Sequence, residues 1–244
     1  MATVDEIALS QVGICASVPS VGDGVCSVCH GCPGTGFQTC WSCHQVSGQL
    51  SKPCSLVVPI SLYEIPSQLH HLLRHYKSGK YPRHQEDFSV RVVSLLAYFL
   101  ATHGTCISKR GGGEWDVVTS VPSSRPRVGE HPLVTSIRRV KLLGERFEML
   151  LQLGTGQVGH LNASDDGFAV TRLVSGKRVL LIDDTFTTGA TAQSAASALA
   201  LGGATVVAIV AIGRVINPSF NEMVEGYWKR QRAVPFTFDR CCLE

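Results

Sequence analysis

The sequence from Val179 to Thr191 reads VLLIDDTFTTGAT, and this stretch decides the fold. It opens with four apolar residues in a row, which predict a short strand buried on both faces of a parallel sheet. Two carboxylates, Asp183 and Asp184, end the apolar run. An alanine-rich segment, Ala190 to Leu201, then predicts a helix that two following glycines close. The stretch is therefore a predicted strand, loop and helix.

The loop in the middle of this stretch combines hydroxyl side chains with a glycine. At a helix N-terminus, backbone N–H groups and the positive end of the helix dipole favour an anion, and threonine hydroxyls add donors. The loop therefore predicts a phosphate site. The carboxylates just before it suit vicinal sugar hydroxyls or a hydrated metal ion, so a phosphorylated ribose fits both halves. The candidate phosphate-binding residues are Thr185, Thr187, Thr188, Gly189, Ala190 and Thr191.

The same stretch resembles the fingerprint of the type I phosphoribosyltransferases, which has four hydrophobic residues, two acidic residues and a Thr/Gly-rich loop. The resemblance implies that the loop holds the 5′-phosphate of phosphoribosyl pyrophosphate (PRPP), and that Asp183 and Asp184 are the catalytic pair on the ribose hydroxyls. An ordinary strand–helix unit with an acidic turn is the alternative. That alternative explains the strand and the helix, but not a pair of Asp followed by four Thr within seven residues.

Length and composition indicate a soluble globular protein. The 244 residues are 44% hydrophobic and carry a net charge of +3, which gives no sign of a basic nucleic-acid groove. The first residues are acidic and show no signal-peptide pattern. The longest apolar stretch, Val90 to Leu100, is interrupted by Arg91 and Ser94 and is too short to span a bilayer. We therefore expect a cytoplasmic location and no membrane partner.

Ten cysteines in a reducing compartment favour metal binding over disulfides. Two C-x2-C pairs lie ten residues apart, at Cys26/Cys29 and Cys40/Cys43. Four thiolates at this spacing predict a closed, structural Zn2+ site. The competing ligands are the nearby residues Cys32, His30, His44 and Cys54.

These signals divide the chain into four parts. Residues 1–25 lack periodicity and predict a flexible leader. Residues 26–54 form the predicted zinc knuckle, residues 55–213 the α/β domain, and residues 214–244 a C-terminal tail. In the tail, four aromatic side chains are expected to pack back on the domain. They are Tyr227, Trp228, Phe236 and Phe238.

The α/β domain contains further predicted elements. A tyrosine-containing strand at 56–63 precedes a helix at 67–82 that has Lys77 near its end. A helix at 87–103 follows, and then a second core strand at 115–122 that runs into Arg125. The apolar run at 205–212 predicts another parallel strand.

With the double knuckle, this order resembles the ComF family of phosphoribosyltransferase-like proteins. The resemblance implies a type I phosphoribosyltransferase fold with an N-terminal zinc module. It also implies pyrophosphate contacts from Lys77 and Arg125. Without it, Lys77 is only a cation placed favourably at a helix C-terminus, and Arg125 lies in a Pro/Ser turn.

The chain also departs from the ComF pattern. The family's R-G-F-N-Q stretch is replaced by RVGEHPL from Arg127, and a later Gln/Leu/Arg/Asn/Phe spacing survives only as Gln157, Leu161, Asn162 and Phe168. Those segments cover the acceptor in transferases. A G-x-G-x-x-G match at 154–159 lacks the strand and helix of a dinucleotide site, so we reject that function.

The resulting functional prediction is a PRPP-binding protein that uses Mg2+ with PRPP, contains structural Zn2+, and transfers the phosphoribosyl group to a nitrogen acceptor. Members of the family are sometimes described as amidophosphoribosyltransferases, but that activity needs an N-terminal cysteine. Position 2 is Ala, so no glutaminase activity is expected. The alternative is a non-catalytic, nucleotide-responsive binding protein whose knuckle contacts single-stranded DNA or a protein partner, because ComF proteins are associated with DNA uptake in competent bacteria.

Overall fold

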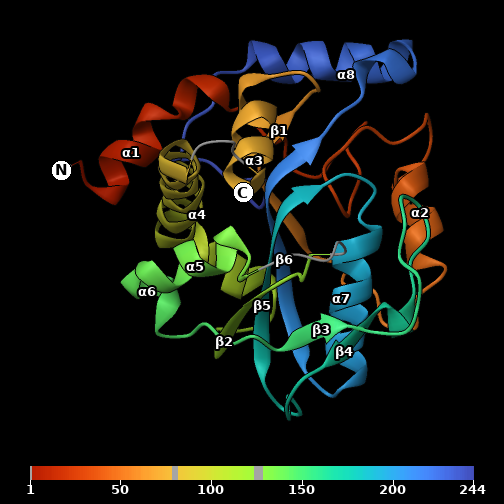
Figure 1. Ribbon diagram of the computed structural model, residues 1–244. Coiled ribbons are helices and arrows are strands. Elements are labelled where there is room, and N and C mark those ends of the chain that lie inside the picture. The colour runs from red at the N-terminus through yellow and green to blue at the C-terminus, as the bar shows by residue number, and fades with distance from the viewer. Residues whose placement is uncertain (1, 79–81, 124–128) are drawn as a thin grey trace.

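The computed structural model describes residues 2–78, 82–123 and 129–244. It is an α/β structure built on a four-stranded parallel sheet, as the sequence predicts (Figure 1). The strands lie in the order β1-β6-β5-β2. Their bounds are Val57–Tyr63 for β1, Val117–Ser120 for β2, Arg178–Phe186 for β5 and Thr205–Val215 for β6.

Strand β5 divides the core into two faces. Its side chains alternate, so Leu180 and Ile182 pack on one face while Val179 and Leu181 pack on the other. All four are fully buried. An apolar run without polar alternation is what a strand covered on both faces needs.

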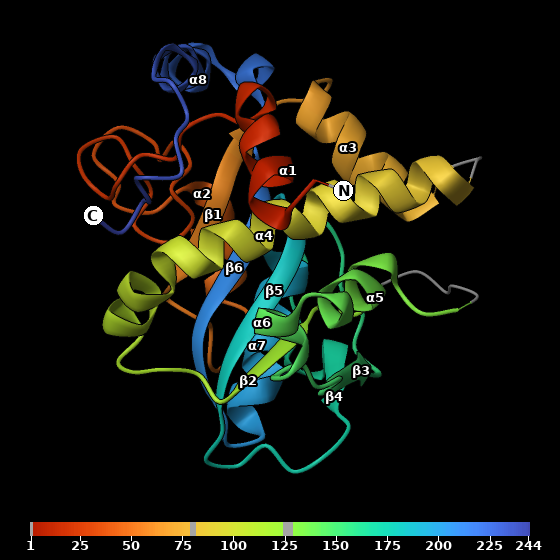
Figure 2. The same cartoon turned by 90° about the vertical axis from the view of Figure 1, so that its left-hand side faces the viewer.

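Within the described residues, five helices cover the first face, and Figure 2 shows the longest of them crossing in front of the sheet. They are α1 (Val4–Ser10), α3 (Gln68–Ser78), α4 (Pro82–Arg110), α5 (Pro132–Arg139) and α6 (Lys141–Gly144). The predicted helix at 67–82 begins one residue before α3, but its predicted end lies at Pro82, where α4 begins. Helix α4 extends beyond the predicted 87–103 at both ends. Only the central part of α4 carries the dense apolar face that a sequence pattern detects.

The second face carries helix α7 (Ala190–Leu201), whose bounds match the prediction. A small antiparallel hairpin of β3 (Leu151–Leu153) and β4 (Phe168–Val170) and the short helix α2 (Trp41–Ser47) complete this side (Figure 1). The alanines of α7 allow a close approach to the sheet, because they present little volume. Helices therefore flank the sheet on both sides.

The N-terminal segment, predicted as a flexible leader, contains a helix in its first half. Helix α1 begins at a capping box in which Thr3 and Glu6 exchange hydrogen bonds, and a 3-10 turn follows at Val12–Ile14. Ala8 is fully buried against the first face, and Ala16 bridges to Leu62 of β1. The short helix lacks the long apolar repeat that reveals a helix in a sequence, and tertiary contact holds it.

The C-terminal segment packs on the domain. Strand β6 continues past residue 213 to Val215, so the predicted boundary falls inside the strand. A 3-10 turn (Pro218–Phe220) leads into helix α8 (Glu222–Ala233). All four predicted aromatic side chains are buried. Tyr227 and Trp228 join a small cluster with Leu62 and Ile216.

One helix, Arg83–Arg110 within α4, is long and apolar enough to cross a membrane by length and composition. In this structure 56% of its most apolar window is buried inside the protein. Its apolar side chains therefore serve as the core of the first face of the sheet.

We predict that Leu96→Ala in α4 lowers the free energy of unfolding by about 2–5 kcal/mol, because it leaves a cavity at a fully buried position. The matched control is Leu201→Ala at the end of α7, where the side chain is 48% exposed and the expected loss is below about 1 kcal/mol. Urea denaturation of both variants provides the measurement. Equal losses would contradict the placement of α4 in the core.

Candidate functional site

The predicted acidic pair lies within β5 rather than after it. β5 continues to Phe186, because Thr185 and Phe186 still pair with β6. Successive residues of a strand point to opposite faces, so Asp183 and Asp184 face different sides of the sheet. Asp184 therefore shares the side on which α3 packs, and Asp183 shares the side of α7.

Asp184 is held by two neighbours from the end of α3. Tyr76 donates a hydrogen bond from its hydroxyl to Asp184 Oδ2, and Lys77 Nζ lies 2.6 Å from the same oxygen. Asp184 and Tyr76 are both buried, whereas the Lys77 side chain is 34% exposed. Tyr76 lies on the apolar face of α3, so the sequence pattern explains it as a core residue. The structure shows that its hydroxyl also belongs to this site.

Asp183 sits in a position that disfavours its charge. Burial, reinforced by the negative charge of Asp184, raises the pKa of Asp183 to about 7, and Lys77 opposes the shift. The carboxyl is therefore poised between its protonated and ionised forms near neutral pH. A perturbed carboxyl at the edge of a parallel sheet is a typical feature of a functional site.

The Thr/Gly loop forms a tight turn into α7. Gly189 is the N-cap and has φ +89°, and a Cβ at this position would lie 2.3 Å from the Phe186 ring. Only glycine fits both the left-handed backbone and this close approach. Thr188 is buried, donates its hydroxyl hydrogen bond to the His160 carbonyl and accepts one from Ala190 N–H at 3.4 Å. Thr188 thus holds the loop in place.

Two adjoining pockets open beside β5 and share Asp183, Thr185 and Thr191. The first has a volume of about 160 Å3 and is also lined by Lys77 and Asp184. The second, of about 270 Å3, is lined by the rest of the predicted phosphate loop, including Thr187, Thr188, Gly189 and Ala190. The structure thus brings together the predicted site residues that it describes. Arg125 lies outside the described residues.

A loop from the β3–β4 hairpin forms the outer wall of the second pocket. Val158, Gly159 and His160 line it. The G-x-G-x-x-G match lies here, and its first glycine packs against the Asp166 carbonyl, which a Cβ on Gly154 would approach to 2.1 Å. Close packing of two backbone segments therefore explains why residue 154 is a glycine.

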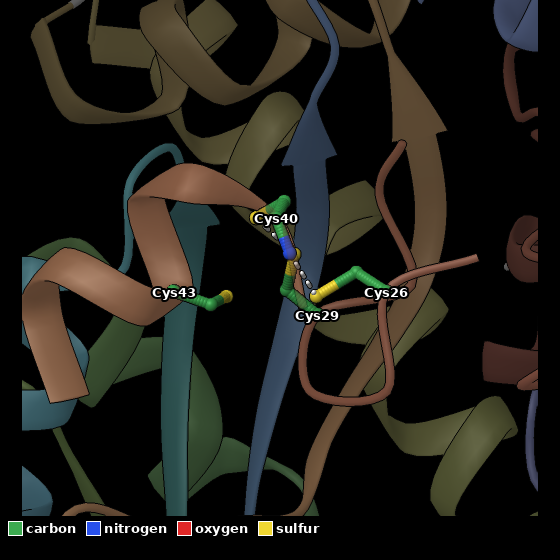
Figure 3. Close-up of side chains that lie close together, drawn as sticks. All are labelled: Cys26, Cys29, Cys40 and Cys43. Atoms are coloured by element: carbon green, nitrogen blue, oxygen red, sulfur yellow. Dashed lines mark hydrogen bonds between the residues drawn. The ribbon is translucent and has the colours of Figure 1, made fainter. Parts of the chain in front are cut away.

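The four predicted metal ligands also meet in space. Their sulfur atoms lie within 4.8 Å of one another, and all four cysteines are buried (Figure 3). Cys29 Sγ and Cys40 Sγ are 3.7 Å apart, which matches the edge of about 3.8 Å expected for a tetrahedron with Zn–S bonds of about 2.3 Å. The competing Cys32 and Cys54 instead lie by the carbonyls of Pro33 and Leu56. The cluster can hold a zinc ion.

The thiols of this cluster are not equivalent without a cation. Hydrogen bonding to the other three thiols, with help from the Arg214 charge, lowers the pKa of Cys29. Hydrogen bonds with Cys26 and Cys29 raise the pKa of Cys40. Only some of the thiols can therefore ionise unaided, and a bound cation is needed to make all four thiolates.

Arg214 joins the metal cluster to the phosphate loop, which the sequence did not reveal. Its guanidinium donates to the carbonyls of Thr187 and Val215, and its Nη2 lies 3.4 Å from Cys29 Sγ. The side chain is 7% exposed, and the guanidinium lies 5.5 Å from the centre of the Phe186 ring. The predicted tail boundary separated Arg214 from the domain, but it is a core residue of β6. The buried Arg214 guanidinium therefore contacts both the four-cysteine cluster and the predicted phosphate loop.

Comparison of the sequence with models of known protein families finds no match, and comparison with curated proteins finds none either. The structure therefore defines the class of protein by itself. It is an α/β protein that has a parallel sheet flanked by helices and a buried four-cysteine cluster.

We predict that Arg214→Gln weakens both the fold and metal retention, because it removes a charge beside the thiolates and leaves carbonyls without a donor. The expected loss of unfolding free energy is about 2–4 kcal/mol. Zinc should also transfer to a chromophoric chelator faster from Arg214→Gln than from the wild type. The matched control is Arg178→Gln, since Arg178 donates to three carbonyls away from the cluster. Zinc transfer that is unchanged in Arg214→Gln, or equally fast in both variants, would contradict the link.

We also predict that Asp183→Asn changes the pH dependence of stability. A folded pKa of about 7 against an ordinary value of 3.8 means that the folded state holds the proton more tightly. Wild-type stability should therefore fall as pH rises from about 4 to about 7, by about 4 kcal/mol relative to the variant. Urea midpoints across this range test the effect, with exposed Asp166→Asn as the control. If the difference in unfolding free energy between wild type and Asp183→Asn does not vary with pH, the raised pKa of Asp183 is contradicted.

Proposed function

We propose that the protein binds PRPP at the carboxyl end of β5 and transfers its phosphoribosyl group to a nitrogen acceptor with release of pyrophosphate. The observation that supports this most is the sharing of Asp183, Thr185 and Thr191 by two adjoining pockets. One extended ligand lying across both would meet the phosphate loop at one end and Lys77 at the other.

In this arrangement the 5′-phosphate occupies the pocket at the start of α7. The first turn of a helix carries N–H groups that have no intrahelical acceptor, and they attract an anion. Thr187 and Thr191 add hydroxyls at the wall of the pocket. Thr188 acts indirectly, through its bond to the His160 carbonyl.

The acidic pair lies between the two ends and serves the ribose. Asp183, shared by both pockets, accepts hydrogen bonds from ribose hydroxyls, which favours its ionised form. Asp184 is positioned by Tyr76 and Lys77. Lys77 is partly exposed, so its ammonium can turn from Asp184 toward the pyrophosphate.

The reaction breaks the bond from C1′ to the pyrophosphate oxygen and forms a bond from C1′ to nitrogen. Such chemistry depends on positioning and on stabilising the leaving group, so it requires no side-chain nucleophile. Mg2+ would neutralise charge on the diphosphate, and carboxylate oxygens such as those of the Asp pair are ligands that it accepts. The resemblance to phosphoribosyltransferases implies that Arg125, which lies outside the described residues, contacts the leaving pyrophosphate.

A second candidate function is a non-catalytic binding protein in which PRPP or a nucleotide alters contact with a partner. It is favoured by two exposed aromatic side chains on the zinc knuckle, Phe37 at 72% and Trp41 at 61%. Residues 26–54 contain one lysine and no arginine. Neutralising phosphates needs Lys or Arg, so a protein partner suits this surface better than single-stranded DNA.

We predict that calorimetric titration with PRPP and Mg2+ shows binding to the wild type and none to the double variant Asp183→Asn with Asp184→Asn. The control is Asp166→Asn, an exposed carboxylate outside both pockets. Thr191→Val should weaken both PRPP and ribose 5-phosphate about tenfold, through loss of one hydrogen bond to a charged group. It should leave free pyrophosphate unaffected.

The outcomes of these titrations distinguish the two candidate functions. Binding that needs the Asp pair justifies screening nucleobases and amines for pyrophosphate release. PRPP binding without release for any acceptor favours the second candidate. A folded, zinc-loaded wild type that does not bind PRPP contradicts the proposed function.

A further inference from the structure

A second group of metal-ligand side chains lies at the far end of α4 from the site described above. It contains His103 and Cys106 of α4 together with Cys241 and Glu244 of the C-terminal segment. Their ligand atoms lie within 4.8 Å of one another. We propose that these four residues form a second zinc site, which clamps the C-terminal segment onto α4. This proposal does not depend on the proposed function.

The distances within the group fit a zinc tetrahedron. Cys106 Sγ lies 3.4 Å from Cys241 Sγ and 3.7 Å from His103 Nδ1, and His103 Nδ1 lies 3.5 Å from Glu244 Oε1. Zinc bonds of about 2.0–2.3 Å to N, O and S place neighbouring ligand atoms about 3.4–3.8 Å apart. The observed separations therefore leave room for one ion with little movement.

His103 is already oriented as a ligand. Its Nε2 lies 2.7 Å from the Phe238 carbonyl oxygen, which can only accept, so Nε2 carries the proton. In the neutral ring the lone pair is then on Nδ1, the atom that faces Cys106 and Glu244. A hydrogen bond from the second ring nitrogen to a carbonyl is the usual support of a metal-binding histidine.

The supporting shell is rigid. His103 is 2% and Cys241 7% exposed. The Phe238 ring packs edge-on against Tyr98 and Phe236, with ring centres 4.8 and 5.1 Å apart, so the carbonyl that orients His103 is itself held. Cys106 is half-buried, and Glu244 is open to solvent, with half of its side chain exposed. An ion can therefore enter from this side without unfolding the core.

The ligand types favour zinc over harder ions. Two thiolates and an imidazole suit Zn2+, whereas Mg2+ and Ca2+ prefer oxygen ligands. Both ligand pairs also have three-residue spacing, H-x2-C at 103–106 and C-x2-E at 241–244. This spacing is a weak signal in the sequence, because 135 positions separate Cys106 from Cys241.

The experiment counts zinc in the full-length protein, purified under reducing conditions so that Cys106 and Cys241 stay as thiols. Mass spectrometry of the bound metal should find two zinc ions per wild-type chain. Cys106→Ser with Cys241→Ser should retain one. The matched control is Cys15→Ser with Cys242→Ser, two cysteines outside both clusters, and it should retain two.

Three further measurements guard against variants that merely unfold. Near-ultraviolet circular dichroism should show that the Cys106/Cys241 variant remains folded. Glu244→Gln changes a half-exposed side chain, and it should weaken binding of the second zinc ion at least about tenfold. Binding of the first zinc ion should not change. Hydrogen exchange of residues 236–244 should slow when wild type takes up its second zinc ion.

A wild type that holds one zinc ion would overturn the proposal if the double variant Cys40→Ser with Cys43→Ser loses that ion, because the ion then belongs to the first cluster. Two zinc ions that both remain in the Cys106/Cys241 variant would also overturn it. A Glu244→Gln variant that binds both ions as tightly as wild type would remove Glu244 from the ligand set and refute the site as proposed.

Discussion

The parallel pairing of β5 with β6 on one side and β2 on the other is the constraint on which the rest of this structure depends. This central strand carries apolar side chains on both faces, and both faces must therefore be covered to keep those side chains from water. The helices supply that cover, with α4 on one face and α7 on the other. Because parallel strands end together, the same constraint collects the acidic pair, the phosphate loop and Lys77 at one edge.

A second constraint is electrostatic and ties the zinc knuckle to that edge. Four thiolates around a divalent ion leave a net negative charge, which is costly to bury without a nearby cation. Arg214 provides the cation from near the end of β6, and its Nη1 donates to the Thr187 carbonyl in the predicted phosphate loop. The knuckle is therefore not a separate appendage. The Cys29 thiol, the guanidinium and the Thr187 carbonyl form one buried chain of contacts.

The two cysteine clusters lie where the N-terminal and C-terminal segments meet the core of the domain. The four-cysteine cluster lies in the N-terminal segment, which has few apolar residues of its own, and the proposed second site lies where the C-terminal segment meets α4. Short segments bury too little surface to hold a unique position by apolar contact alone. Zinc bound at both clusters would supply that order in a small volume.

The sequence alone determined the elements whose signals are local. The apolar run of β5, the alanine-rich α7, the strand at 205–212 and the spacing of the four clustered cysteines are each readable within a few residues, because strand burial, helix propensity and chelation all act over short distances. Only the tertiary structure decided that the leader is helical, that Tyr76 bonds Asp184, that Arg214 joins the metal cluster to the phosphate loop, and that His103 meets Cys241. These contacts join residues up to 185 positions apart, and a sequence carries no local pattern for a partner that only folding brings near.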